Sequence, residues 1–355
     1  MSAWGRLLPG PGPALRMILL AGMVTVVSGC SIFETTRDTE TYIIASVYSH
    51  HTYTVGARNA PIGVFISRGM DSTWEHVGAP NVKAWSTSIA YAGGHPYLVL
   101  CSGSGYHLSV SARDWSTPTD WHISDVMTVH HDSSRRRIVL GTASGILYGE
   151  GSVMPQWRRV SGLGATSYVT AFHEVRHPER VLFAATETGV LRSTDLGSSW
   201  SRSGCEGRAV KCLASADTSA LLAGTEDHGV YRSTDNGSTW EQLPSTAGLT
   251  VYALDLEHAD GEQAWYAGTF EQGVLRSTDG GATWTSVGLA GMIVHDLLRV
   301  EDRLYAATIG SGVYVYEDGD WRSLGLSTAR VWSLTAFEAP RGWMDPPHRW
   351  WEERK

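Results

Sequence analysis

Three aspartates occupy the same place in three nearly identical octapeptides. Asp195, Asp235 and Asp279 are the third residues of STDLGSSW, STDNGSTW and STDGGATW, which end at Trp200, Trp240 and Trp284. Repeated carboxylates can hold a cation or do acid-base chemistry if they converge, or each can accept backbone hydrogen bonds within its own turn. The glycines two residues later, Gly197, Gly237 and Gly281, favour the turn because glycine reaches a positive φ at little cost. We therefore expect a structural turn with a packed tryptophan, and no metal site.

The octapeptides are part of a longer repeat. Tryptophans close successive units at intervals of 36 to 47 residues, at Trp74, Trp121, Trp157, Trp200, Trp240, Trp284 and Trp321. Each unit holds four short β-type runs separated by turn residues, and no segment between Thr41 and Ala339 has a helical period. This period predicts an all-β protein, a seven-bladed β-propeller of four-stranded antiparallel blades.

The end of the repeat leaves two alternatives open. The first unit begins with the strand-like run 42–47, and residues 330–336 match the first-strand pattern an eighth time. The second segment either opens an incomplete eighth blade or helps to close the ring between the first and last blades. The tail that follows, residues 340–355, is rich in Pro and contains Trp343, Trp350 and Trp351. It is either a latch packed on the propeller or an exposed docking segment.

The motif S-x-D-x-G-x-x-W resembles the Asp-box, or BNR repeat, of sialidase, sortilin and xyloglucanase propellers and of photosystem II assembly-factor propellers. The resemblance covers residues 41 to 335, is strong in units four to six, is degraded in units one and seven, and keeps only the tryptophan in units two and three. It implies that these turns lie on the face opposite the ligand site. It is specific for the fold and weak for any one function.

Function is therefore expected at the rim, the loops that enter the first strand of each unit or join its second strand to its third. Four rim carboxylates are weak catalytic candidates: Glu187, Glu226, Asp227 and Glu271. Glycoside hydrolysis needs two carboxylates on opposite sides of the bond, and neighbouring loops can supply them. Loop carboxylates that are only solvated are commoner than catalytic ones, so we expect none of the four to be catalytic. Arg58-Asn-Ala-Pro61 also departs from the Arg-Ile-Pro signature of sialidases, and xyloglucanases use a cleft between two propellers.

The first thirty residues predict export and lipidation. Arg6 and Arg16 precede an apolar run from Met17 to Val27 that is too short for a membrane span and typical of a secretion signal. The run ends in Val-Ser-Gly-Cys30, which resembles the bacterial lipobox. The resemblance implies that residues 1–29 are removed, that Cys30 carries the lipid anchor, and that Ser31 directs the protein to the outer membrane. The alternative is an ordinary signal with an incidental cysteine.

Composition limits the partners. Removing residues 1–29 takes away two of the 28 basic residues and none of the 36 acidic ones, which leaves a net charge of −10 and argues against nucleic acid. No nucleotide-binding or cofactor motif is present, and the adjacent histidines 50–51 and 130–131 point to opposite faces of a strand, which argues against a metal site.

The arginines that precede the octapeptides, Arg192, Arg232 and Arg276, are expected to lie over aromatic rings or pair with carboxylates.

The remaining cysteines suggest at most one crosslink. Cys205 and Cys212 are close in sequence, so we consider a disulfide between them, with two buried thiols as the alternative. The sequence thus divides into the signal peptide 1–29, a lipidated linker 30–40, the propeller 41–339 and the tail 340–355. We expect a non-catalytic envelope lipoprotein whose rim binds a protein or an envelope polymer as a scaffold or assembly factor. The alternative is a glycan-active enzyme, a glycoside hydrolase, or a glycan-binding lipoprotein.

Overall fold

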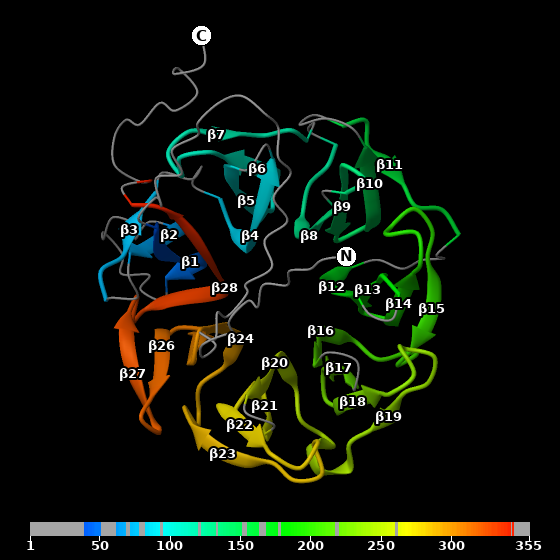
Figure 1. The fold of residues 1–355 in the computed structure, drawn as a ribbon, viewed down its shortest axis with the longest axis vertical. Helices are drawn as coiled ribbons and strands as arrows, with labels where there is room; N and C mark the ends of the chain where they lie inside the picture. Colours follow the sequence, from blue (N-terminus) through cyan, green and yellow to red (C-terminus); the bar gives the residue numbers. More distant parts are fainter. Residues whose placement is uncertain are drawn as a thin grey trace, which may run out of the picture. The chain divides into compact units, whose positions relative to one another are not determined.

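The computed structural model describes residues 39–50, 62–68, 72–77, 82–92, 95–119, 122–132, 134–150, 155–162, 168–176, 179–216, 220–259, 262–341 and 343. Cys30 with its predicted signal, the Arg58–Pro61 loop, Trp121, Trp350 and Trp351 lie outside these ranges. In the described part, the chain forms seven antiparallel sheets of four strands each and no α-helix, only the short 3-10 turn Pro244–Thr246. The sheets stand radially as the blades of a ring (Figure 1), which confirms the predicted seven-bladed β-propeller. No helix in the described ranges is long and apolar enough to cross a membrane.

Each blade runs from an inner strand beside the central axis to an outer strand, as Figure 1 shows. Blade one contains β28 (Ala329–Pro340), β1 (Thr39–His50), β2 (Gly63–Arg68) and β3 (Glu75–His76). Blade two contains β4 (Ala84–Ala92), β5 (His95–Ser102), β6 (Gly105–Ser109) and β7 (Trp115–Ser116). Blade three contains β8 (Val126–Asp132), β9 (Arg137–Thr142), β10 (Gly145–Glu150) and β11 (Arg158–Arg159). Blade four contains β12 (Val169–Val175), β13 (Val181–Thr186), β14 (Gly189–Ser193) and β15 (Ser201–Gly204).

The other three blades repeat this order. Blade five contains β16 (Val210–Ala216), β17 (Ala220–Thr225), β18 (Gly229–Ser233) and β19 (Glu241–Gln242). Blade six contains β20 (Val251–Ala259), β21 (Glu262–Thr269), β22 (Val274–Ser277) and β23 (Thr285–Gly288). Blade seven contains β24 (Val294–Val300), β25 (Arg303–Thr308), β26 (Gly312–Glu317) and β27 (Asp320–Gly325).

The core lies between the blades. The second strands β13 and β17, VLFAAT and ALLAGT, are buried along their whole length, because each blade is covered on both faces by its neighbours. One cluster joins Phe183 of blade four to Val210 and Ala223 of blade five. Large side chains from one blade meet small ones from the next, which is how closely spaced sheets reach the packing density of a protein interior.

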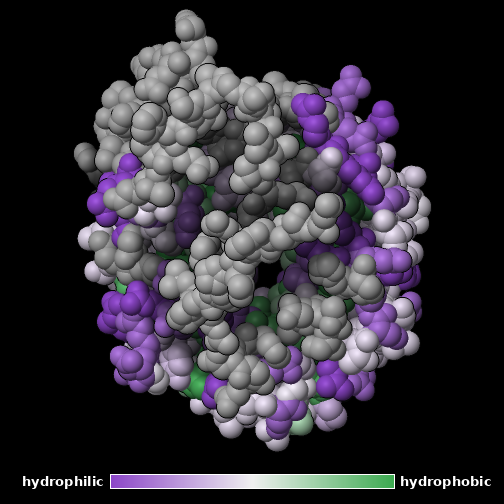
Figure 2. Space-filling view, viewed as in Figure 1, coloured by the Kyte–Doolittle hydropathy of each residue, from purple (hydrophilic) through white to green (hydrophobic). Residues whose placement is uncertain are grey.

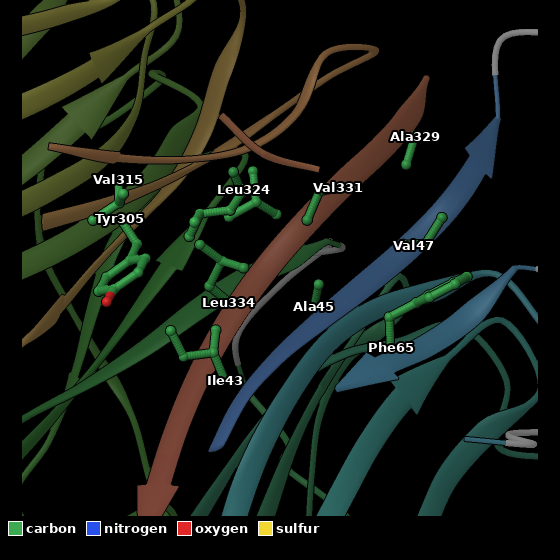
Figure 3. Close-up of a cluster of buried hydrophobic side chains, with 12 residues drawn as sticks. Ile43, Ala45, Val47, Phe65, Tyr305, Val315, Leu324, Ala329, Val331 and Leu334 are labelled. Carbon is green, nitrogen blue, oxygen red and sulfur yellow. The ribbon is translucent and has the colours of Figure 1, made fainter. Parts of the chain in front are cut away.

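The two ends of the repeat close the ring. Strand β28 pairs with β1 from Thr39 opposite Pro340 to His50 opposite Ala329, and Figure 3 shows buried side chains of both strands in one cluster with β25 and β26. No eighth blade forms in the described residues. Residues 42–47 are therefore in the second strand of blade one, not its first, and the C-terminal strand β28 takes the inner position. The pairing removes two exposed sheet edges.

The octapeptides form closed turns between third and fourth strands. In STDNGSTW the Ser233 hydroxyl and the Thr239 amide each donate to Asp235 Oδ1 at 2.8 Å, and the Thr239 hydroxyl donates to Asp235 Oδ2 at 2.6 Å. These bonds from Thr239 lower the pKa of Asp235 to about 2. Gly237 has φ 81° and donates its amide to Ser233 Oγ. The turns at Asp195 and Asp279 make the same set of bonds, so each carboxylate is satisfied within its own turn.

Several of the tryptophans that close the repeat units donate to the preceding blade, whereas Trp200 donates to the Gly197 carbonyl of its own turn. Trp240 donates its indole N–H to Ser203 Oγ at 3.3 Å, on β15 of the preceding blade. Trp321 and Trp74 donate in the same way to backbone carbonyls at Val287 and Leu324 of their preceding blades. In blade two the equivalent ring is Trp115, which donates to the Val77 carbonyl, rather than the predicted Trp121. These indole hydrogen bonds thus join neighbouring blades.

The disulfide considered between Cys205 and Cys212 does not form, and the alternative of two free thiols is confirmed. Both thiols are free, and they pack on opposite sides of blade five: Cys205 belongs to the cluster shared with blade four and Cys212 to the cluster shared with blade six. Burial raises the pKa of each thiol to about 12. Of the repeated arginines, Arg232 pairs with Glu241 and Arg276 lies 5.9 Å from the centre of the Tyr266 ring.

The start of the tail packs on the propeller. The Trp343 ring lies 4.9 Å from that of Phe337 and 5.7 Å from that of Tyr42, centre to centre, beside the core cluster of blades one and two. This part of the tail therefore acts as a latch, as one of the two sequence alternatives expected.

Candidate functional site: the rim of the propeller

The rim is tied together by backbone hydrogen bonds. The Glu187 amide donates to the Tyr168 carbonyl, and the Phe270 amide donates to the Thr250 carbonyl, so the second-to-third loop is joined to the start of the inner strand in these blades. Bonds also cross between blades, as from the Gly291 amide to the Glu271 carbonyl. Because these described loops are short and bonded to their neighbours, their side chains are held on a rigid scaffold, which suits recognition.

A β-bulge recurs at the same place in all seven inner strands. One residue near the rim end of each inner strand has no partner on the second strand, and these residues are Trp332, Trp85, Met127, Thr170, Lys211, Tyr252 and His295 in blade order. A bulge re-aims a side chain and is over-represented next to functional sites. The repeat therefore places seven residues at equivalent positions on the inner strands, which surround the central axis in Figure 1; most of them are half-buried, and Met127 is buried. The space-filling view in Figure 2 shows hydrophilic residues around the outer edge of the ring.

Four bulged aromatic residues and two neighbouring rings form a continuous arc. We define it as the rim arc of Phe270, Tyr252, His295, Trp332, Trp85 and Tyr48, in which Phe270 follows β21 and Tyr48 lies on β1. The Trp332 ring centre lies 4.1 Å from His295 and 5.4 Å from Trp85, and His295 stacks on Tyr252 at 5.1 Å. Tyr48 contacts both tryptophans. Phe270, 41% exposed, ends the arc beside Tyr252. The rings are half-buried, so they offer apolar faces without being sealed in the core.

The predicted rim carboxylates do not form one cluster with defined roles. Glu187, Glu226, Asp227 and Glu271 are all exposed. Glu226 is paired with the bulged Lys211 at 2.6 Å, and Asp227 exchanges hydrogen bonds with the Thr250 hydroxyl. Burial first, and then the charges of Glu226 and Asp227, raise the pKa of Tyr252, a member of the rim arc. The arrangement suits binding more than general acid and base chemistry, which needs a carboxyl held against the reacting bond.

Two titratable groups lie side by side in β24. Burial lowers the pKa of His295 to about 4, and the charge of Lys211 acts in the same direction. Burial raises the pKa of Asp296 to about 7, although its oxygens accept backbone hydrogen bonds from Leu334 and Leu297. At neutral pH His295 is therefore uncharged and donates Nδ1–H to the Trp332 carbonyl at 2.8 Å.

His295 should make the propeller sensitive to acid. Its pKa is lower in the folded chain than the ordinary value of about 6.5, so its contribution to stability is complete above pH 6.5 and is lost as the pH falls toward 4. When the pH falls from 7 to 4.5, we expect the free energy of unfolding of the wild type to fall by about 2 kcal/mol more than that of His295→Gln. The glutamine amide can still donate to the Trp332 carbonyl. Denaturant titrations at both pH values measure this difference. Asp296 acts in the opposite direction but equally in both proteins, and parallel profiles would contradict the prediction.

A separate cavity lies on the opposite face, between blades six and seven. It has a volume of about 360 Å³ and is lined by ion-paired side chains, among them Arg299, Glu257 and Glu317. Arg299 pairs with Asp255 at 2.6 Å and with Glu257 at 3.2 Å. In the described ranges, no group of three or more His, Cys, Asp or Glu side chains is arranged to hold a metal ion.

The sequence prediction placed function at the rim but missed the bulged residues. It named only four carboxylates, Glu187, Glu226, Asp227 and Glu271. The available signal was positional: Trp85, Tyr252, His295 and Trp332 each follow a small or β-branched residue at the start of an inner strand. Which residue lacks a ladder partner depends on pairing with the second strand, and a single strand's pattern does not reveal it.

The fold and the rim define the class of protein as a seven-bladed β-propeller with an aromatic channel mouth. Comparison with solved structures agrees with the fold. The extracellular domain of the putative one component system BT4673 from B. thetaiotaomicron matches with a TM-score of 0.57 and 13% identity over 78% of this chain. The present chain covers only 38% of that domain.

Two further structures are similar at the same level. The computationally designed Ika8 protein matches with a TM-score of 0.55 and 13% identity over 82% of this chain and 90% of its own. The AfRom2 CNH domain has a TM-score of 0.52 and 8% identity over 68% of this chain and 83% of its own. Neither a protein-family model nor a curated protein matches the sequence. At these identities the likeness establishes the fold alone.

Proposed function

We propose that this chain is a non-catalytic lipoprotein of the bacterial cell envelope, anchored through Cys30 in the outer membrane, whose rim binds a protein partner or an envelope polymer. The observation that carries the binding function is the ring of bulged inner-strand residues, which gathers the rim arc at one end of the propeller. Large, rigid aromatic faces on a fixed scaffold give contact area at little cost in conformational entropy. The lipobox-like Val-Ser-Gly-Cys30 supports the anchor.

The rim arc should carry most of the affinity. In the full chain, produced with its own N-terminus and captured from crosslinked membranes, we expect Trp85→Ala/Trp332→Ala to recover at least about tenfold less partner than the wild type, because truncating a central aromatic typically costs 2 kcal/mol or more. Tyr91→Ala is the control, since Tyr91 is 57% exposed at the other end of inner strand β4. Equal recovery by the wild type and the tryptophan variant would place the binding surface elsewhere.

A second candidate is a glycan-active enzyme or a glycan-binding lipoprotein. The nearness of Glu226 and Asp227 to Tyr252 favours it, because an aromatic face beside carboxylates can hold a sugar ring. A glycan array identifies binding, and chromogenic glycosides detect turnover. Turnover that is lost on Glu226→Gln or Glu271→Gln would replace the non-catalytic proposal with a glycoside hydrolase. Cys30→Ala should release the protein from the membrane fraction, which tests the anchor independently.

A further inference from the structure

The chain enters the propeller on the face opposite the rim. We call this the box-turn face, since it carries the turns at Asp195, Asp235 and Asp279. Strand β28 begins at the rim, where the Gly310 amide donates to the Ala329 carbonyl, and ends on the box-turn face. Strand β1 runs antiparallel to it with Thr39 opposite Pro340, so Thr39 lies on the box-turn face.

The segment before β1 is short. Residues 31–38 separate Cys30 from Thr39, and a fully extended chain of this length spans at most about 30 Å. A lipid on Cys30 therefore keeps the box-turn face close to the membrane surface. The rim arc, at the other end of the same blades, then points away from that membrane.

The charge of the molecule is unevenly distributed. Residues 126–204, which make blades three and four, contain nine arginines and six acidic residues, a net charge of +3. The rest of the chain after residue 29 keeps 17 of 26 basic and 30 of 36 acidic residues, a net charge of −13. A positive sector in so acidic a protein is a candidate surface for an anionic partner.

Five of these arginines lie on two hairpins of the box-turn face. We call Arg135, Arg136, Arg137, Arg176 and Arg180 the guanidinium patch; they lie at or beside the β8–β9 and β12–β13 connections. Arg135 and Arg137 both donate to the Asp195 carbonyl, at 3.0 and 2.7 Å, which joins the patch to the box turn of blade four.

Two acids of this cluster lie beneath its surface, whereas Glu179 and Glu150, the partner of Arg137, are exposed. Arg180 pairs with Asp132 at 3.2 Å and with Glu174 at 2.6 Å, and these two carboxylates are only 1% and 9% exposed. The side chain of Arg176 is 75% exposed, and Arg136 is also exposed. Three guanidinium groups are therefore exposed, those of Arg135, Arg136 and Arg176, beside the carboxylates of Glu150 and Glu179. Guanidinium groups bind phosphate through paired N–H donors.

We propose that the guanidinium patch docks the box-turn face of blades three and four on anionic lipid head groups of the membrane that holds Cys30. The inference rests on the proposed lipid anchor and adds an orientation to it, with the rim directed outward. Asp302, Asp318 and Asp320 are exposed on the same face in blade seven, so an anionic surface repels that side. Contact is confined to the sector of blades three and four.

The test uses residues 31–355 without an anchor, because the ring closes within 39–340 and residues 38–355 form one compact unit. The protein is sedimented with vesicles of phosphatidylcholine alone and with vesicles in which about two lipids in five are phosphatidylglycerol, an anionic lipid. We expect binding to the anionic vesicles only, weakened by salt. Arg136→Glu/Arg176→Glu should lower partitioning by about 25-fold or more, since each basic residue near such a surface contributes about fivefold.

The control is Arg113→Glu/Arg322→Glu, which changes the net charge equally at exposed positions of blades two and seven and should leave most of the binding. Arg136→Gln/Arg176→Gln with an unchanged melting temperature guards against misfolding.

Equal binding to both kinds of vesicle, no binding to either, or undiminished binding by the Glu variant would overturn the proposal. Tighter binding of soluble polyphosphate than of vesicles would assign the patch to an acidic polymer. Because Cys30 is missing from this protein, failure here is separate from failure of the anchor or of rim binding.

Discussion

A chain that ends at Leu326 is expected not to fold. The truncation removes β28, and with it Val331, Leu334 and Phe337, which are all at most 5% exposed. It also uncovers Ile43 and Ile44, both fully buried in the intact ring. At about 1.5–3 kcal/mol per buried side chain, the loss is of order 10 kcal/mol. That is as large as the whole stability of a typical domain.

The control is a chain that ends at Arg341. It keeps the full β1–β28 pairing and loses the packing of Trp343 on Tyr42 and Phe337, which we expect to cost about 1–2 kcal/mol. Soluble yield, near-ultraviolet circular dichroism and urea titration compare the two chains. A cooperative urea transition in the Leu326 chain, close to that of the Arg341 chain, would show that the inner strand of blade one does not hold the ring closed.

Most of the fold could be predicted from the repeat, but the repeat left two alternatives for residues 330–336, of which ring closure is confirmed. The octapeptides and the 41-residue period indicated four strands per blade and seven blades. Residues 42–47 and 330–336, however, have the same apolar character, because in this fold both the first and the second strand lie between two neighbouring blades. Which of them is innermost depends on pairing across nearly the whole chain. That is a long-range property that local pattern does not carry.

The prediction of Trp121 as the tryptophan of blade two was wrong for a different reason. The turn before Trp115 reads SVSARDW and lacks the Asp and Gly at their places in the motif, so the prediction took Trp121 on spacing alone. In the structure Trp115 performs the role of the ring, since its indole N–H reaches the preceding blade. A turn can therefore keep the indole hydrogen bond between blades after losing the hydrogen-bonded carboxylate.

The candidate site was harder to predict than the fold. Sequence patterns show charged residues in loops, and so the four rim carboxylates were named. They do not show that the residue after Val251, Val294 or Val331 has no partner on the second strand. The bulge has no residue preference of its own, since Trp, Met, Thr, Lys, Tyr and His all occupy it. The backbone is repeated, and the side chains at the bulge are what this chain varies around the ring.

The box turns fix how closely neighbouring blades approach, and one glycine should be decisive for that contact. Gly237 has φ 81°, and a Cβ placed on it would lie 2.5 Å from Phe183 Cε1 and 2.8 Å from Ser203 Oγ, both in the preceding blade. Gly237→Ala therefore combines backbone strain of about 1–2 kcal/mol with overpacking of about 1–3 kcal/mol. We expect the free energy of unfolding to fall by about 3 kcal/mol.

Gly207→Ala separates the two causes. Gly207 has φ 71°, so alanine there meets a similar backbone strain, but nothing lies within 4 Å of its Cβ. We expect a loss of only about 1 kcal/mol, and the difference between the two variants in urea titration measures the steric contact between blades. If both variants lost the same free energy of unfolding, the packing around Phe183 would adjust to the added methyl group. The closed turn would then act through its own backbone and not by setting the distance between blades.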